Sequence, residues 1–90
     1  MEMSVQAETK KVIENYYRSP FDFSVELSSM IPGLSFTPQV VYQWLNGGVP
    51  RYTTLLAILY ASEATGNIRV AEWATRLLAA AQPEYWGERV

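Results

Sequence analysis

The fold of this chain is decided by the stretch Phe36-Thr-Pro-Gln-Val-Val-Tyr-Gln-Trp-Leu-Asn-Gly-Gly-Val-Pro-Arg-Tyr52. It predicts one short helix with a clear signal at each end. Thr37 is a good N-cap, because its hydroxyl can accept a hydrogen bond from an amide of the first turn. Pro38 suits the first helical position, where no N–H is needed. After Asn46, two glycines tolerate positive φ and stop the helix.

The predicted helix separates into a buried face and an outward face. Val41, Trp44 and Leu45 recur at helical spacing and form a stripe that we expect to be buried. The opposite face is uncharged and offers amides and a phenol, which can read hydrogen-bond donors and acceptors. In the major groove of DNA, glutamine can pair with adenine and an apolar group can touch the thymine methyl. A short helix with such a face is typical of the recognition helix of a helix-turn-helix.

The same residues carry a resemblance to the phage repressor/Cro superfamily. It rests on Gln39-Val-Val-Tyr-Gln-Trp-Leu-Asn-Gly47, on Pro50-Arg51, and on the apolar helix that begins Thr-Thr-Leu-Leu-Ala. The chain looks most like the small phage CII-type activators, and the resemblance covers roughly residues 23–66. Members usually open the turn with a glycine where this chain has Ser35. Here the glycine is Gly33, so we expect a longer turn.

The residues and the resemblance together assign roles in binding double-stranded DNA. We expect base edges to be contacted by Pro38, Gln39, Tyr42 and Gln43. We expect the DNA backbone to be held by Thr37, Asn46, Arg51 and Thr53, since exposed amides at a helix start bind phosphate readily. The alternatives are that the glutamines belong to an ordinary solvated face and that Arg51 is a surface cation without a partner.

Charge argues in part against this interpretation. The chain has a net charge of −2, whereas nucleic-acid-binding proteins usually carry a basic surface. However, no acidic residue lies between Glu26 and Glu63, and Arg51 is the only basic residue there. Few phosphate contacts mean weak binding per subunit. We therefore expect two or more copies, a dimer or a tetramer, to bind DNA together.

Helical periodicity predicts four further helices along the chain, at about residues 5–18, 20–31, 53–65 and 68–81. The N-cap of the helix predicted at about residues 53–65 is expected near Tyr52 or Thr53. The chain is therefore expected to be all-α: a compact, lambda repressor-like bundle of about five helices with a helix-turn-helix. Residues 1–82 form the domain and residues 83–90 a short C-terminal tail.

The last predicted helix has more apolar surface than one narrow stripe. Val70 and Trp73 lie off its main apolar line, and the polar tail contains Tyr85 and Trp86. Because large exposed apolar patches mark interaction sites, we expect these four residues to form an oligomer interface. The alternatives are that Trp73 packs inside the monomer and that the tail is a frayed end.

Composition limits the other classes of function. The 90 residues make one domain, and 49% hydrophobic content favours a folded chain. Cysteine and histidine are both absent, which removes thiolate metal sites and the commonest general base. No glycine-rich phosphate loop is present, and no serine or threonine is paired with a base in a known motif. We expect no enzymatic activity, no metal, no cofactor and no small-molecule substrate.

The absence of a long apolar run or a signal peptide favours a cytoplasmic protein with no membrane contact, prokaryotic or encoded by a phage. The sequence thus predicts a sequence-specific transcriptional regulator that binds DNA as an oligomer. The alternative is a protein-interaction module on the same fold, such as an antitoxin, an adaptor or an inhibitor. The acidic composition and the aromatic tail favour this second interpretation.

Overall fold

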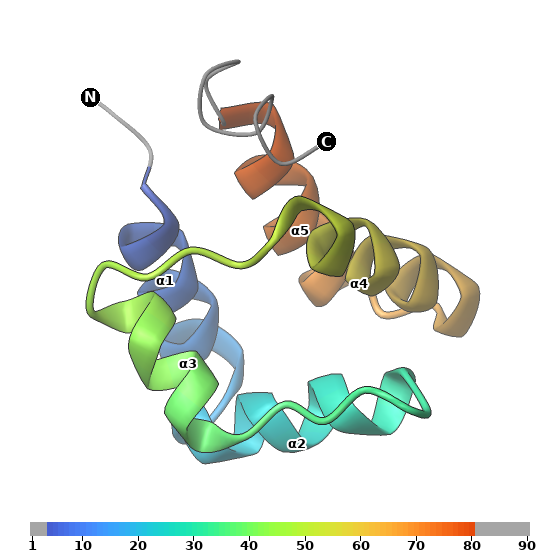
Figure 1. The fold of residues 1–90 in the computed structure, drawn as a ribbon, viewed down its shortest axis with the longest axis horizontal. Helices are drawn as coiled ribbons and strands as arrows, with labels where there is room; N and C mark the ends of the chain where they lie inside the picture. Colours follow the sequence, from blue (N-terminus) through green and yellow to red (C-terminus); the bar gives the residue numbers. More distant parts are fainter. Residues whose placement is uncertain (1–3, 81–90) are drawn as a thin grey trace.

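Five α-helices and no strand are found in residues 4–80, which are the residues that the computed structural model describes (Figure 1). Their bounds are α1 Val5–Tyr16, α2 Pro20–Met30, α3 Pro38–Leu45, α4 Tyr52–Thr65 and α5 Ile68–Ala80. The prediction of an all-α fold with about five helices is confirmed. Within the described range, no helix combines the length and the apolar character that crossing a membrane requires.

Short polar side chains begin most of the helices. The hydroxyls of Ser4, Ser19 and Thr37 each accept a hydrogen bond from the amide three residues later, at 3.0, 3.3 and 3.3 Å. Asn67 Oδ1 does the same for α5, at 3.2 Å. These caps satisfy amides that have no partner within the first helical turn. The local sequence therefore determines where α1, α2, α3 and α5 begin.

Helix α4 starts differently from the other helices. Its N-cap residue is Arg51, and no side-chain hydrogen bond caps it. The cap expected near Tyr52 or Thr53 is thus displaced to Arg51, since Tyr52 already has helical geometry. At the other end Gly66 has a φ of 74°, a conformation that costs glycine little. Asn67 follows at once and begins α5.

One apolar core joins all five helices. Burial of a side chain the size of leucine or phenylalanine contributes about 1.5–3 kcal/mol. A helix as short as α3 is marginal in isolation, so this packing is what holds it. The core residues are Val12, Ile13, Phe23, Leu27, Phe36, Val41, Trp44, Leu55, Ile58, Val70, Trp73, Ala74 and Leu77.

A row of aromatic rings runs through this core. Trp73 lies 5.2 Å from Phe23 and 5.6 Å from Trp44, measured between ring centroids. The row continues to Tyr17, 5.1 Å from Phe23, and to Phe36, 6.3 Å from Trp44. Edge-to-face and tilted pairs at these separations add to the energy of area burial. The row therefore ties α3 to α2 and α5.

The structure corrects the prediction that Val70 and Trp73 face a second subunit. Their exposed fractions in the monomer are 0% and 2%. The indole Nε1 of Trp73 also donates a buried hydrogen bond of 3.1 Å to Thr9 Oγ1 on α1. Both residues face inward because α5 packs against α1 as well as against α4. The other two residues of that predicted interface, Tyr85 and Trp86, lie outside the described range.

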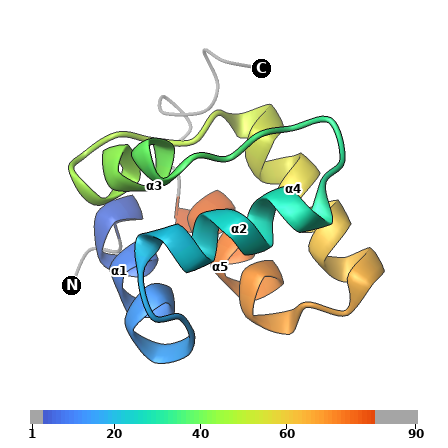
Figure 2. The same cartoon turned by 90° about the horizontal axis from the view of Figure 1, so that it is seen from below.

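Residues 31–37 connect α2 to α3 and run back alongside α2, as Figure 2 shows. Ser28 fixes this path, because its hydroxyl donates to Phe36 O at 3.1 Å and accepts from Phe36 N at 3.0 Å. Gly33 turns the chain at the far end with a φ of 92°. A helix-turn-helix usually has a turn of about 3–4 residues. The connection is therefore longer than that motif requires, as expected from the position of Gly33 in the sequence.

Candidate functional site

The outward face of α3 borders a shallow depression of about 520 Å³. It is lined by four of the residues selected from the sequence and by one glycine: Gln39, Tyr42, Gln43, Asn46 and Gly48. The first four side chains are all exposed, and Tyr42 has an exposed fraction of 51%. Two glutamine amides, one asparagine amide and one phenol are thus gathered on one surface, which we call the α3 face.

The core sets the rotation of α3 that creates this face. Val41 and Trp44 are buried, and Leu45 is half-buried against the same core. Residues at the complementary helical positions must therefore point away from the core. Pro38 is only half-buried at the first helical position and does not line the depression.

The C-terminal edge of the depression is held by close backbone contacts. Gln43 O accepts hydrogen bonds from Asn46 N at 3.1 Å and from Gly48 N at 2.6 Å. A Cβ at position 48 would lie 2.7 Å from Gln43 O, so only glycine fits there. Asn46 Nδ2 donates to Tyr42 O at 2.9 Å, which orients the amide. Gly48 was not selected from the sequence, although the second glycine of Asn46-Gly-Gly was a signal for it.

The residues expected to hold the DNA backbone do not all gather at this surface. Thr37, Arg51 and Thr53 are exposed but do not line the depression. Thr37 caps α3, whereas Arg51 and Thr53 stand at the start of α4. The connection after α3 carries the chain across to α4 (Figure 1). Of the four expected backbone contacts, only Asn46 therefore lies among the expected base-contacting residues.

The α3 face carries no charged side chain. Arg51 is the single charged residue between Glu26 and Glu63 in the sequence. A neutral surface of amides avoids repelling phosphate, but it also provides little long-range attraction. Any ligand of this face would therefore be held by hydrogen bonds and shape at short range.

Two exposed apolar residues on α2 were missed by the sequence reasoning. Phe21 and Val25 have exposed fractions of 57% and 50%. Their spacing of i and i+4 places them on one side of the helix, opposite the buried Phe23 and Leu27. That spacing is a signal in the sequence, because it marks a second apolar side of the helix.

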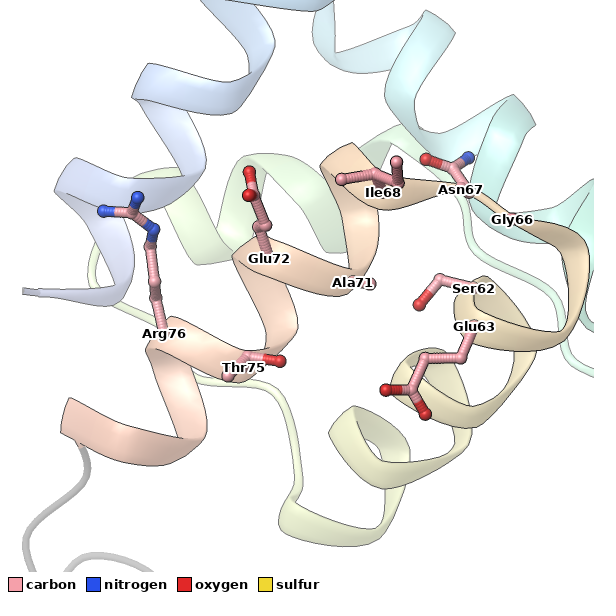
Figure 3. A pocket seen from close by; sticks show the side chains of 9 residues that line it. All are labelled: Ser62, Glu63, Gly66, Asn67, Ile68, Ala71, Glu72, Thr75 and Arg76. Atoms are coloured by element: carbon pink, nitrogen blue, oxygen red, sulfur yellow. The ribbon is translucent and has the colours of Figure 1, made fainter.

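A second depression, of about 460 Å³, lies between α4 and α5 (Figure 3). Its walls combine small and apolar residues such as Ala71 and Ile68 with the charged Glu63, Glu72 and Arg76. Ser62 also lines it, but its hydroxyl donates to the backbone oxygen of Leu59 at 2.9 Å. A buried serine bonded in this way is satisfied by its own helix. Ser62 therefore has a structural role.

A polar cluster of Tyr17, Glu26 and Asn67 joins α1, α2 and α5. The Tyr17 hydroxyl donates to Glu26 Oε2, and Asn67 Nδ2 donates to the same oxygen at 2.6 Å. Burial raises the pKa of Tyr17 well above its ordinary value, and the hydrogen bond to Glu26 raises it further. Since Asn67 also caps α5, the cluster fixes the relative positions of three helices.

No group of three or more metal-ligating side chains occurs within residues 4–80. Comparisons of the chain with protein-family models, with curated proteins and with solved structures find no match. The arrangement of side chains is therefore the basis for assigning a function.

Proposed function

We propose that this protein is a sequence-specific DNA-binding transcriptional regulator of prokaryotic or phage origin that reads bases with the α3 face. The observation that carries the proposal is the gathering of Gln39, Tyr42, Gln43 and Asn46 on one exposed, uncharged helix surface. An α-helix fits the major groove of DNA, where each base pair presents a distinct pattern of donors and acceptors. The resemblance to the phage repressor/Cro superfamily, which covers this helix, supports the same function.

The chemistry of the α3 face fits base readout. Gln39 and Gln43 are one turn apart, so each amide can reach the edge of a different base pair. An amide can donate and accept at once, which matches N6 and N7 of adenine. Tyr42 adds a phenol beside the two amides. The side chains are presented by a helix held in the core, which gives the precision that readout requires.

Phosphate contacts supply most of the affinity of DNA-binding proteins. Arg51 and Thr53 at the start of α4 are the residues we assign to that role, with Thr37 at the start of α3. One cation near the reading surface is few for a monomer. The proposal therefore includes binding by two or more copies, whose combined contacts provide usable affinity.

The first prediction concerns Gln39 and Gln43. We expect wild-type protein to enrich a sequence motif from a random pool of DNA duplexes at moderate salt, and Gln39→Ala/Gln43→Ala to lose it. Removing a good bidentate contact costs about 1–3 kcal/mol of discrimination. Both side chains are exposed, so the double variant should unfold at nearly the wild-type urea concentration.

The matched control is Gln6→Ala, which removes an exposed glutamine from α1. It should enrich the same motif as wild type. The proposal fails if folded wild-type protein at high concentration enriches no motif, or if the double variant enriches the motif as well as wild type does.

The alternative function, a protein-interaction module, is favoured by the exposed Phe21 and Val25 on α2. Aromatic residues are enriched at the centres of protein interfaces. Salt separates the two functions, because DNA binding weakens steeply as salt concentration rises, whereas an apolar interface responds little. Binding to another protein that persists at high salt and is lost in Val25→Ser would favour the protein-interaction module.

A further inference from the structure

The end of α3 brings together the groups needed for a chemical modification. Asn46 is exposed and is followed by Gly47, which has a φ of 101° and open space around its Cα. The Gly47 amide forms no hydrogen bond among the described residues. A peptide nitrogen without a neighbouring Cβ is accessible to the side chain of the preceding asparagine.

We propose that Asn46 deamidates spontaneously and that this modification places a carboxylate on the α3 face. The Gly47 nitrogen, after losing its proton to a solvent base, forms a bond to Cγ of Asn46. The Cγ–Nδ2 bond breaks, and Nδ2 leaves as ammonia. Water then opens the five-membered imide at either carbonyl, which yields aspartate or isoaspartate. The reaction consumes only water and needs no oxidant or enzyme.

The contacts around Asn46 permit this ring closure. The side chain is held by one hydrogen bond, from Nδ2 to Tyr42 O at 2.9 Å. Closure requires release of that bond and rotation about the Cα–C bond of Asn46, whose ψ is 27°. This rotation swings the Asn46–Gly47 peptide. No hydrogen bond to the Gly47 amide opposes it, whereas the 2.6 Å bond from Gly48 N to Gln43 O must also be released.

The chain contains two other asparagines, Asn15 and Asn67, which serve as internal controls. Asn15 lies within α1 and precedes Tyr16. Asn67 holds Glu26 and caps α5, and it precedes the β-branched Ile68. In both cases the following residue has a Cβ beside the attacking nitrogen, and its peptide belongs to a helix. Neither asparagine has the free glycine amide that Asn46 has.

The consequence for binding rests on the proposed function. The α3 face has no carboxylate, and Arg51 is the only cation in that part of the sequence. One negative charge at position 46 would meet the phosphates of DNA and repel them. Deamidation would therefore act as a slow, irreversible loss of DNA binding that proceeds with the age of each molecule.

The test measures conversion of each asparagine by peptide mass mapping during incubation at neutral and mildly alkaline pH. We expect the acid at Asn46 to form about tenfold or more faster than at Asn15 and Asn67, because Gly47 lacks a Cβ. Asn46→Gln keeps the amide but needs a larger ring, so position 46 should stay unconverted. Gly47→Ala should slow conversion too, with circular dichroism monitoring its fold.

Several outcomes would overturn the proposal. Equal conversion at all three asparagines removes the special role of Gly47. Native protein that converts far more slowly than the urea-unfolded chain shows that the turn protects Asn46. Conversion of Asn46→Gln at the wild-type rate refutes the ring mechanism.

Binding to the duplex selected by wild type is measured separately for Asn46→Asp and Asn46→Gln. We expect the Asp variant to bind about tenfold more weakly than the Gln variant, because it adds a charge near phosphate. Equal binding by the two variants refutes the switch while leaving the modification in place. If wild type selects no duplex, the proposed function fails, and the conversion rates still decide the chemistry.

Discussion

Thr9 shows how one small polar residue contributes to the core. Its side chain is fully buried, and Oγ1 accepts the indole proton of Trp73 at 3.1 Å. A buried indole N–H without an acceptor destabilises the folded protein by the full free-energy cost of removing that group from water. Thr9 therefore allows a tryptophan, rather than a purely apolar residue, to fill the junction between α1 and α5.

The second prediction is that Thr9→Val destabilises the protein by about 1–3 kcal/mol, because valine keeps the volume but leaves the Trp73 N–H unpaired. Urea unfolding followed by circular dichroism measures the change. Thr53→Val is the matched control, since Thr53 is exposed. Equal stability of Thr9→Val and wild type would mean that the hydrogen bond contributes nothing net.

At this scale the sequence predicted some residues well and others poorly. The burial of Val41 and Trp44 follows from spacing within a single short helix, and the structure confirms it. The burial of Val70, Trp73 and Thr9 depends on α1 and α5 packing together, although these helices are far apart in the chain. Periodicity carries no information about which distant helix covers a given side.

Among the elements, the connection between α2 and α3 depends on Ser28. The side chain pairs with both backbone groups of Phe36, at 3.1 and 3.0 Å. Each irregular backbone group near a core needs a partner. One hydroxyl here provides two such bonds and aligns the segment that leads into α3.

The third prediction is that Ser28→Ala lowers stability by about 1–3 kcal/mol, since it leaves two part-buried backbone groups unpaired. The Phe36 amide should also exchange its hydrogen with solvent faster. The adjacent Ser29→Ala is the control, because Ser29 is exposed and bonds only within its own helix. Equal amide protection in both variants would show that Ser28 does not hold the connection.

The ends of the helices were more predictable than the path between them. A cap involves residues three apart, so Ser19 and Thr37 could be identified from the local sequence. The start of α4 lacks such a side chain, so the sequence predicts its cap one or two residues after Arg51, where the structure has it. The return of residues 31–37 along α2 depends on a contact eight residues apart, which no local pattern encodes.

For the molecule as a whole, the cluster of Tyr17, Glu26 and Asn67 connects helices from both ends of the chain. Burial raises the pKa of Tyr17 above the ordinary value of 10.0, and the bond to Glu26 adds to this effect. The folded protein therefore keeps the phenol proton at a pH where the unfolded chain releases it. By linkage, this contribution to stability is complete below pH 10 and is lost progressively as pH rises above it.

The fourth prediction follows from this loss of stability at high pH. The free energy of unfolding should fall as pH rises above about 10, and the fall should be smaller in Tyr17→Phe, which has no proton to lose. Urea unfolding at a series of pH values measures both. Tyr60→Phe is the control, because Tyr60 is highly exposed on α4. Identical pH dependence in wild type and Tyr17→Phe would contradict the assigned role of Tyr17.

The class of the whole fold was predictable because composition and periodicity act on every segment. The absence of strands in residues 4–80 and the five helices follow that expectation. The packing partners of each helix were not predictable, since they depend on contacts such as Asn67 with Glu26. The gathering of four polar residues on α3 needed only the rotation of one helix, so most of the α3 face could be found in the sequence.

The pair of rings formed by Trp44 and Trp73 also makes the protein its own spectroscopic probe. The indoles are buried, and their ring centroids are 5.6 Å apart with planes inclined by 35°, so we expect their excited states to couple and to give a paired signal in far-ultraviolet circular dichroism. One ring belongs to α3 and the other to α5. The signal reports the seating of α3 in the core without any label, and it can be followed while the α3 face is occupied.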